Sequence, residues 1–158
     1  MRDAAVLLTK VLIVLLFAVL LVGQVWIVPA MAEDAASTAP EFAGLRVPGI
    51  VLTVLLLVCV QIVLVCVWRL LSLVDRDEIF QPRAFGWVNA IIIAVLAAVV
   101  LVIAGMILID RAQAGSPFVL ICGILAIIVG LGIALVVVVL KELLRQAAQL
   151  EQDMSEVV

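Results

Sequence analysis

The chain has 158 residues, of which 68% are hydrophobic and 13% are charged, and its mean hydropathy is +1.48. A soluble domain contains roughly half apolar and about a quarter charged residues, so this chain has too few polar residues to cover a core in water. The composition excludes a soluble globular domain and indicates an integral membrane protein. The formal net charge of −3 excludes no class of protein by itself.

Four long apolar runs predict four transmembrane helices. A helix rises about 1.5 Å per residue and needs roughly 20 apolar residues to cross the hydrocarbon of a bilayer. The predicted spans are about 5–28, 48–70, 84–109 and 117–140, within one domain over residues 1–158. The predicted fold class is all-α, a polytopic membrane protein built of two antiparallel helical hairpins.

The first span is expected to stay in the mature protein. Its uncharged part runs from Val11 to Val28, with Trp26 near the end, where an indole prefers the headgroup region. The sequence Ala30-Met31-Ala32 has the form of a signal-peptidase site, but the uncharged part exceeds the roughly 7–15 residues of a signal peptide. Whether the helix is ever cleaved after Ala32 stays open.

Residues 29–47 are predicted to form an irregular loop, because of their Ala, Ser, Thr and Pro content, with prolines at Pro29 and Pro40. Pro48 suits the first turn of the second helix. Within that helix Gln61 is the only strongly polar side chain near the centre of any run. We expect it to hydrogen-bond to a neighbouring helix. The functional alternative is a substrate-contacting group in a polar cavity.

Small residues recur every four positions on the third and fourth spans, a pattern that lets two helices approach closely. They are Ala90, Ala94 and Ala98 on the third span and Ala126, Gly130 and Ala134 on the fourth. Between the two spans, Ser116 and Pro117 suit the N-cap and first position of a helix. Because residues 110–116 form so short a connection, the two spans are expected to be antiparallel neighbours.

The fourth helix is expected to continue without a break into residues 141–158. Apolar residues there follow the i, i+4, i+7, i+11 spacing of one helix face, and the opposite face is polar. They are Leu143, Ala147, Leu150 and Met154. The end of this amphipathic extension is acidic, which disfavours anionic lipid. We expect it to pack against residues 71–83, another subunit or a partner.

The basic residues predict the orientation. Seven of the nine lie on the side shared by the N-terminus, residues 71–83 and the tail. Basic residues beside membrane segments are retained in the cytoplasm. Both termini and residues 71–83 are therefore predicted to be cytoplasmic, and residues 29–47 and 110–116 extracytoplasmic.

The sequence offers little chemistry for catalysis. It has no His and no Tyr, and no span has a charged residue near its centre, as proton-coupled pumps usually do. The cysteines lie in apolar runs without C-x-x-C spacing, and we recognise no nucleotide-binding, metal-binding or hydrolase motif. The exposed segments lack a basic stripe for nucleic acid. We predict no enzymatic activity, no cofactor and no direct binding of nucleic acid.

Two stretches resemble a known family: Asp77 to Val88, DEIFQPRAFGWV, and Leu143 to Ala147, LLRQA, followed by the acidic residues 151–158. They are similar to a family of four-helix bacterial membrane proteins catalogued as a domain of unknown function, in its actinobacterial branch. Members are often encoded beside a small helix-turn-helix regulator of the xenobiotic-response type. The resemblance implies residence in the bacterial inner membrane and a regulatory partner. It implies no catalytic residues.

The leading hypothesis is a non-enzymatic membrane protein that contacts membrane lipids and engages a cytoplasmic protein. The residues expected to form its interaction surface are Ile79, Phe80, Arg83, Phe85, Leu143, Leu150 and Met154. A simpler interpretation is that Phe80 and Phe85 lie in lipid and Arg83 at phosphate, which only anchors the loop. The alternative function is a small transporter or channel subunit that works as a homo-oligomer. It predicts a polar cavity lined by Gln61, Thr53 or Asn89.

Overall fold

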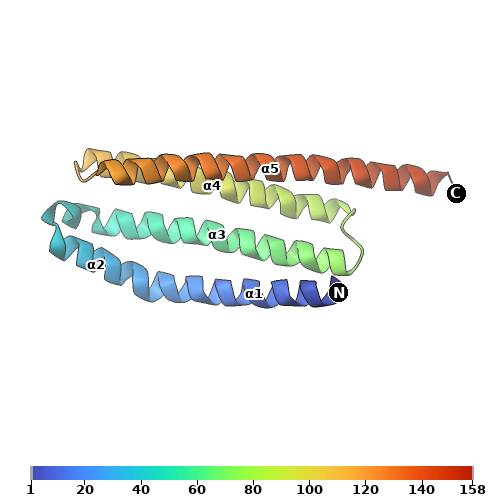
Figure 1. Cartoon of the computed structure of the whole chain (residues 1–158), viewed down its shortest axis with the longest axis horizontal. Helices are drawn as coiled ribbons and strands as arrows, with labels where there is room; N and C mark the ends of the chain where they lie inside the picture. Colours follow the sequence, from blue (N-terminus) through green and yellow to red (C-terminus); the bar gives the residue numbers. More distant parts are fainter. Residues whose placement is uncertain (1, 158) are drawn as a thin grey trace.

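The computed structural model describes residues 2–157, and none of them lies in a strand (Figure 1). The helices are α1 Arg2–Val22, the π-helical turn η1 Gly23–Ile27, α2 Val28–Thr38, the 3₁₀ helix η2 Pro40–Leu45, α3 Arg46–Asp75, α4 Pro82–Arg111 and α5 Pro117–Glu156. Four stretches are long and apolar enough to cross a membrane: Asp3–Thr38, Pro40–Asp75, Pro82–Arg111 and Pro117–Glu156. The prediction of an all-α chain with four such helices is confirmed.

The predicted irregular loop at residues 29–47 is wrong, because this segment is almost entirely helical. Pro29 falls in the first turn of α2 and Pro40 in that of η2, where a missing N–H costs no intrahelical hydrogen bond. The break is confined to Ala39, whose φ of −133° and ψ of 106° are extended. Alanine-rich sequence between the prolines supports the helix.

A π-helical turn joins α1 to α2, closed by a hydrogen bond from the Val28 N–H to the Gly23 carbonyl. Such turns, like proline, bend a helix. The chain bends here, and α2 leans toward α3, which it contacts (Figure 1).

The other helix starts follow the sequence. Pro82 and Pro117 each open a helix after an extended residue, and the Ser116 Oγ accepts a hydrogen bond from the Val119 N–H at 3.3 Å. The last helix, α5, runs unbroken for 40 residues. At about 1.5 Å per residue it is roughly twice as long as the 30 Å hydrocarbon layer is thick.

The long helices pack in the order α1, α3, α4, α5, with α4 between α3 and α5 (Figure 1). Packing of α3 on α4 is as extensive as that of α4 on α5, and the predicted arrangement as two antiparallel hairpins is not confirmed. Both ends of the chain and the α3–α4 connection lie at the same end of the molecule, and the last turns of α5 project beyond it (Figure 1).

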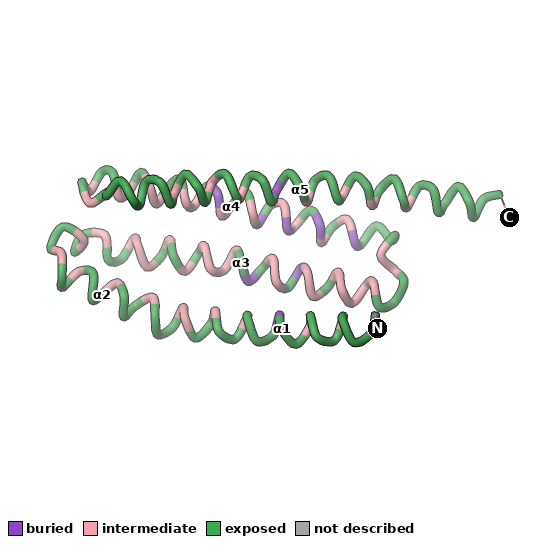
Figure 2. The backbone as a smooth tube through the Cα atoms, in the orientation of Figure 1, coloured by how far each residue is buried: buried purple, intermediate pink, exposed green. Residues whose placement is uncertain are grey.

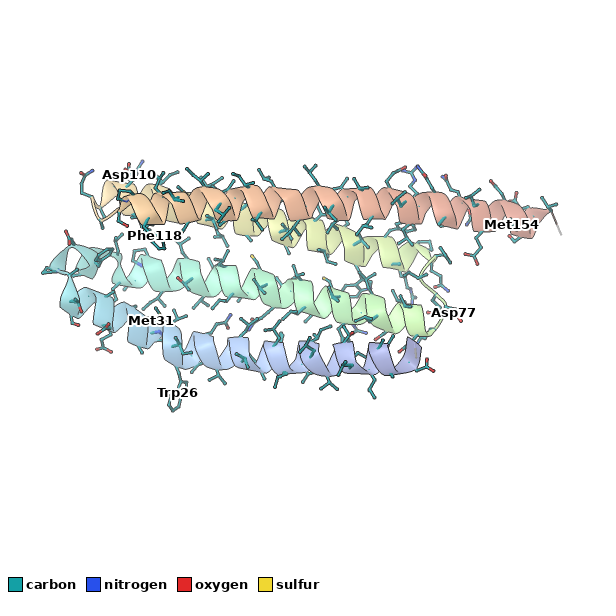
Figure 3. All side chains as sticks on the ribbon, viewed as in Figure 1. Trp26, Met31, Asp77, Asp110, Phe118 and Met154 are labelled. Atoms are coloured by element: carbon teal, nitrogen blue, oxygen red, sulfur yellow. The ribbon has the colours of Figure 1, made fainter. Side chains whose placement is uncertain are left out.

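Burial is concentrated on α4, which contributes five of the eight buried hydrophobic residues (Figure 2). They are Ala84, Val88, Ile91, Ala94 and Val99; the others are Ile13, Cys66 and Ala134. Most remaining apolar side chains are exposed, as expected of helices that lipid surrounds. Trp26, at 76% exposure, points away from the other helices (Figure 3).

The predicted small-residue stripes are used in part. Ala94 and Ala134 are buried, and a Cβ placed on Gly130 would lie 2.6 Å from the Val99 Cγ2 atom. The backbone of α5 therefore comes close to α4 at Gly130. Ala126, by contrast, is exposed.

Candidate functional site

The α3–α4 connection is a defined turn. The Glu78 N–H donates to the Leu73 carbonyl at 2.9 Å and the Asp77 N–H to the Val74 carbonyl at 3.1 Å, while Asp77 has a φ of 54°. This is the Schellman pattern of a helix end, with aspartate in the left-handed position that glycine usually fills. Residues of this turn line two different cavities, one shared with α5 and one shared with α3 and α4.

One side of the turn faces α5. A cavity of about 290 Å³ is lined by Asp77, Phe80 and Gln81 from the turn and by Ala148, Glu151, Gln152 and Ser155 from α5. The turn and the tail are therefore neighbours, as expected. The tail, however, presents its polar face to the turn.

The apolar face of the tail points elsewhere. We call Leu143, Ala147, Leu150, Met154 and Val157 the tail stripe. Its large members are 55% (Leu143), 65% (Leu150), 74% (Met154) and 87% (Val157) exposed. Because a helix turns about 100° per residue, the stripe lies nearly opposite Ala148. The predicted interaction surface is therefore divided, with Phe80 and the tail stripe on different sides of α5.

The other side of the turn faces away from α5. A cavity of about 320 Å³, which we call the arginine cavity, is lined by Arg69, Ser72, Leu73, Arg76, Glu78, Arg83 and Trp87. The Arg69 guanidinium lies over the Trp87 ring, 5.7 Å from its centroid. Of the other residues predicted at this surface, Ile79 and Phe85 are half-buried and Phe80 is 40% exposed.

A polar contact that sequence reasoning missed ties α1 to this end of α3. The Lys10 ammonium donates to the Asp75 carboxylate at 2.8 Å and lies 6.0 Å from the centroid of the Trp68 ring. The two charged residues are 65 positions apart, so no local pattern could pair them.

The polar residues proposed for a transport path lie apart. Gln61 is 7% exposed and lines an apolar cavity with Phe17 and Trp87, among others. Within the described residues its Nε2 atom has no hydrogen-bond partner, so the predicted interhelical bond of this amide group is not confirmed.

The other two residues of that path have partners. The Thr53 hydroxyl donates to the Gly49 carbonyl at 2.8 Å, and the Asn89 Oδ1 accepts from the Lys141 ammonium at 3.4 Å. Thr53 lines a different cavity, between α2 and α3. Neither Thr53 nor Asn89 lines the cavity that contains Gln61.

Comparison with known proteins gives one match. The model of a family described as "Protein of unknown function (DUF2975)" matches residues 30–158, which include the α3–α4 turn and all of α5. No curated protein and no solved structure matches the chain.

Proposed function

Because the chain belongs to the DUF2975 family of proteins of unknown function, we propose a function from its own surfaces: a non-enzymatic protein of the bacterial inner membrane that binds a cytoplasmic protein. The observation that carries this proposal is the exposed tail stripe on the projecting end of α5. Figure 3 marks Met154 on this projection. The last turns of α5 project beyond the other helices (Figure 1), and no other described helix covers Leu150 or Met154.

Charge favours a particular kind of partner. Acidic residues accompany the tail stripe: Glu142, Glu151, Asp153 and Glu156. Acidic side chains disfavour anionic lipid and favour basic protein surfaces. A partner helix with an apolar face and basic flanks would match the stripe. A small helix-turn-helix regulator, which the resemblance to actinobacterial relatives implies, is the candidate.

Substitutions in the stripe test this proposal. In the variant Leu150→Gln/Met154→Gln, recovery of the regulator with the protein, purified from native membranes at its natural level, is expected to fall at least about tenfold, since buried apolar anchors dominate such interfaces. The control Gln149→Ala/Gln152→Ala removes two uncharged residues on another face of α5 and is expected to retain it. Recovery of no cytoplasmic protein, or unchanged recovery after deletion of Leu143–Val158, would refute the proposal.

The proposal requires cytoplasmic termini, which a topology map checks. A reporter fused after Ala36 or after Ala114 is expected outside the cytoplasm, and one fused after Val158 inside it. The reason is that seven of the nine basic residues lie on the side of the N-terminus, residues 71–83 and the tail. Alkaline phosphatase and a fluorescent protein report the two sides. A cytoplasmic Ala36 fusion would reverse the orientation.

A further inference from the structure

The arginine cavity is lined by three arginines and by one acidic residue, Glu78. We propose that Arg69, Arg76 and Arg83 bind one phosphate group, the chemistry shared by an anionic phospholipid headgroup and soluble phosphate. This site is separate from the tail stripe and does not depend on a protein partner.

The charges in the cavity are unbalanced. In the part of the chain that the structure describes, none of the three arginines forms an ion pair, and Glu78 is the one acid that lines the cavity. Like charges brought together in a cleft disfavour one another. A doubly or singly charged phosphate would offset the excess of positive charge.

The three side chains come from the end of α3 and the start of α4, so the fold brings them together. Arg69 lies near the end of α3, Arg76 directly follows its last residue, and Arg83 lies in the first turn of α4. Guanidinium groups bind phosphate through paired N–H donors. Stacking on Trp87 orients the Arg69 group before a ligand arrives.

The start of α4 adds to the attraction for an anion. Its first turn contains no acidic residue, and Gln81 makes no side-chain cap. The partial positive charge of a helix start is therefore not offset there. Ser72 adds no donor, because its hydroxyl already donates to the Trp68 carbonyl at 3.1 Å.

The position of the cavity suits a lipid source. Trp68 and Trp87 stand at the ends of two apolar runs, and tryptophan marks the headgroup level of a bilayer. A phospholipid phosphate at this level would reach the guanidinium groups while its chains lie along the exposed apolar surface of α3 and α4.

The test uses the full chain in neutral detergent, with native mass spectrometry of bound phosphatidylglycerol, phosphatidylcholine and inorganic phosphate. We expect Arg76→Gln/Arg83→Gln to lose at least about tenfold in affinity, since each charged hydrogen bond is worth roughly 1.5–3 kcal/mol. The control Arg145→Gln removes an exposed arginine of α5 that does not line the cavity. It is expected to bind as the wild type does.

The outcomes separate the sources. A lipid site is identified if the protein binds phosphatidylglycerol more tightly than phosphatidylcholine, if the double variant loses this binding, and if inorganic phosphate does not displace the lipid. A soluble ligand is identified if the wild type binds inorganic phosphate and the double variant does not. Equal losses in the double variant and Arg145→Gln, or no difference from the wild type, would overturn the proposal. If the double variant does not fold, Arg76→Lys/Arg83→Lys keeps both charges and is expected to bind more weakly; undiminished binding would equally overturn it.

Discussion

Replacing Gly130 by leucine is expected to push α5 away from α4 and to destabilise the protein strongly. Even a Cβ atom at this position would lie 2.6 Å from the Val99 Cγ2 atom. Val99 is 8% exposed and β-branched, so its side chain has little freedom to turn aside. Overpacking of this kind costs about 1–3 kcal/mol in free energy of unfolding, which a thermal unfolding experiment in detergent would record as a lower Tm.

Gly132→Leu is the matched control. It makes the same chemical change two residues away, where nothing lies within 4 Å of an added Cβ. Its Tm is expected to equal or exceed that of the wild type. Gly123→Leu should fall between the two, because the neighbouring Met106 side chain is flexible. Equal losses of Tm at Gly130 and Gly132 would show that α5 does not pack on α4 as described.

Replacing Gln61 by methionine is expected to stabilise the protein. The Gln61 Nε2 atom is buried and has no hydrogen-bond partner within the described residues. A buried polar group without a partner costs about 1–3 kcal/mol, and methionine has a similar length and helix propensity. Thermal unfolding in detergent would record the gain as a higher Tm.

The exposed Gln149→Met serves as the control for Gln61→Met and is expected to leave the Tm unchanged, because Gln149 is already in contact with solvent. A lower Tm for Gln61→Met would mean that the amide has a partner beyond the single chain, such as a ligand or a second copy. That result would favour the transporter alternative over the proposed function.

Features of the fold that depend on local signals could be predicted from the sequence. Long apolar runs, the Ser116-Pro117 pair and the absence of any breaker after Leu140 each determine structure within a few residues. The segment at residues 29–47 was mispredicted for a related reason. Proline signals both a loop and the first turn of a helix, and the choice depends on which N–H groups need partners.

The faces of the helices could not be predicted in the same way. Which side of α5 turns to α4 depends on close packing at Gly130 and Ala134, and this rotation also directs the tail stripe away from the α3–α4 turn. The arginine cavity likewise joins residues that the sequence presents only as basic flanks. Their shared position depends on how α3 and α4 pack together.

The unbroken course of α5 has a mechanical consequence. Met154 lies about 36 Å along the helix axis from Gly130, at 1.5 Å per residue, so a tilt of roughly 10° about that contact would move it by about 6 Å. Transmembrane helices adjust their tilt to the thickness of the bilayer. If α5 tilts as one rigid helix about its contact with Val99, a change in membrane thickness would displace any protein bound to its C-terminal end.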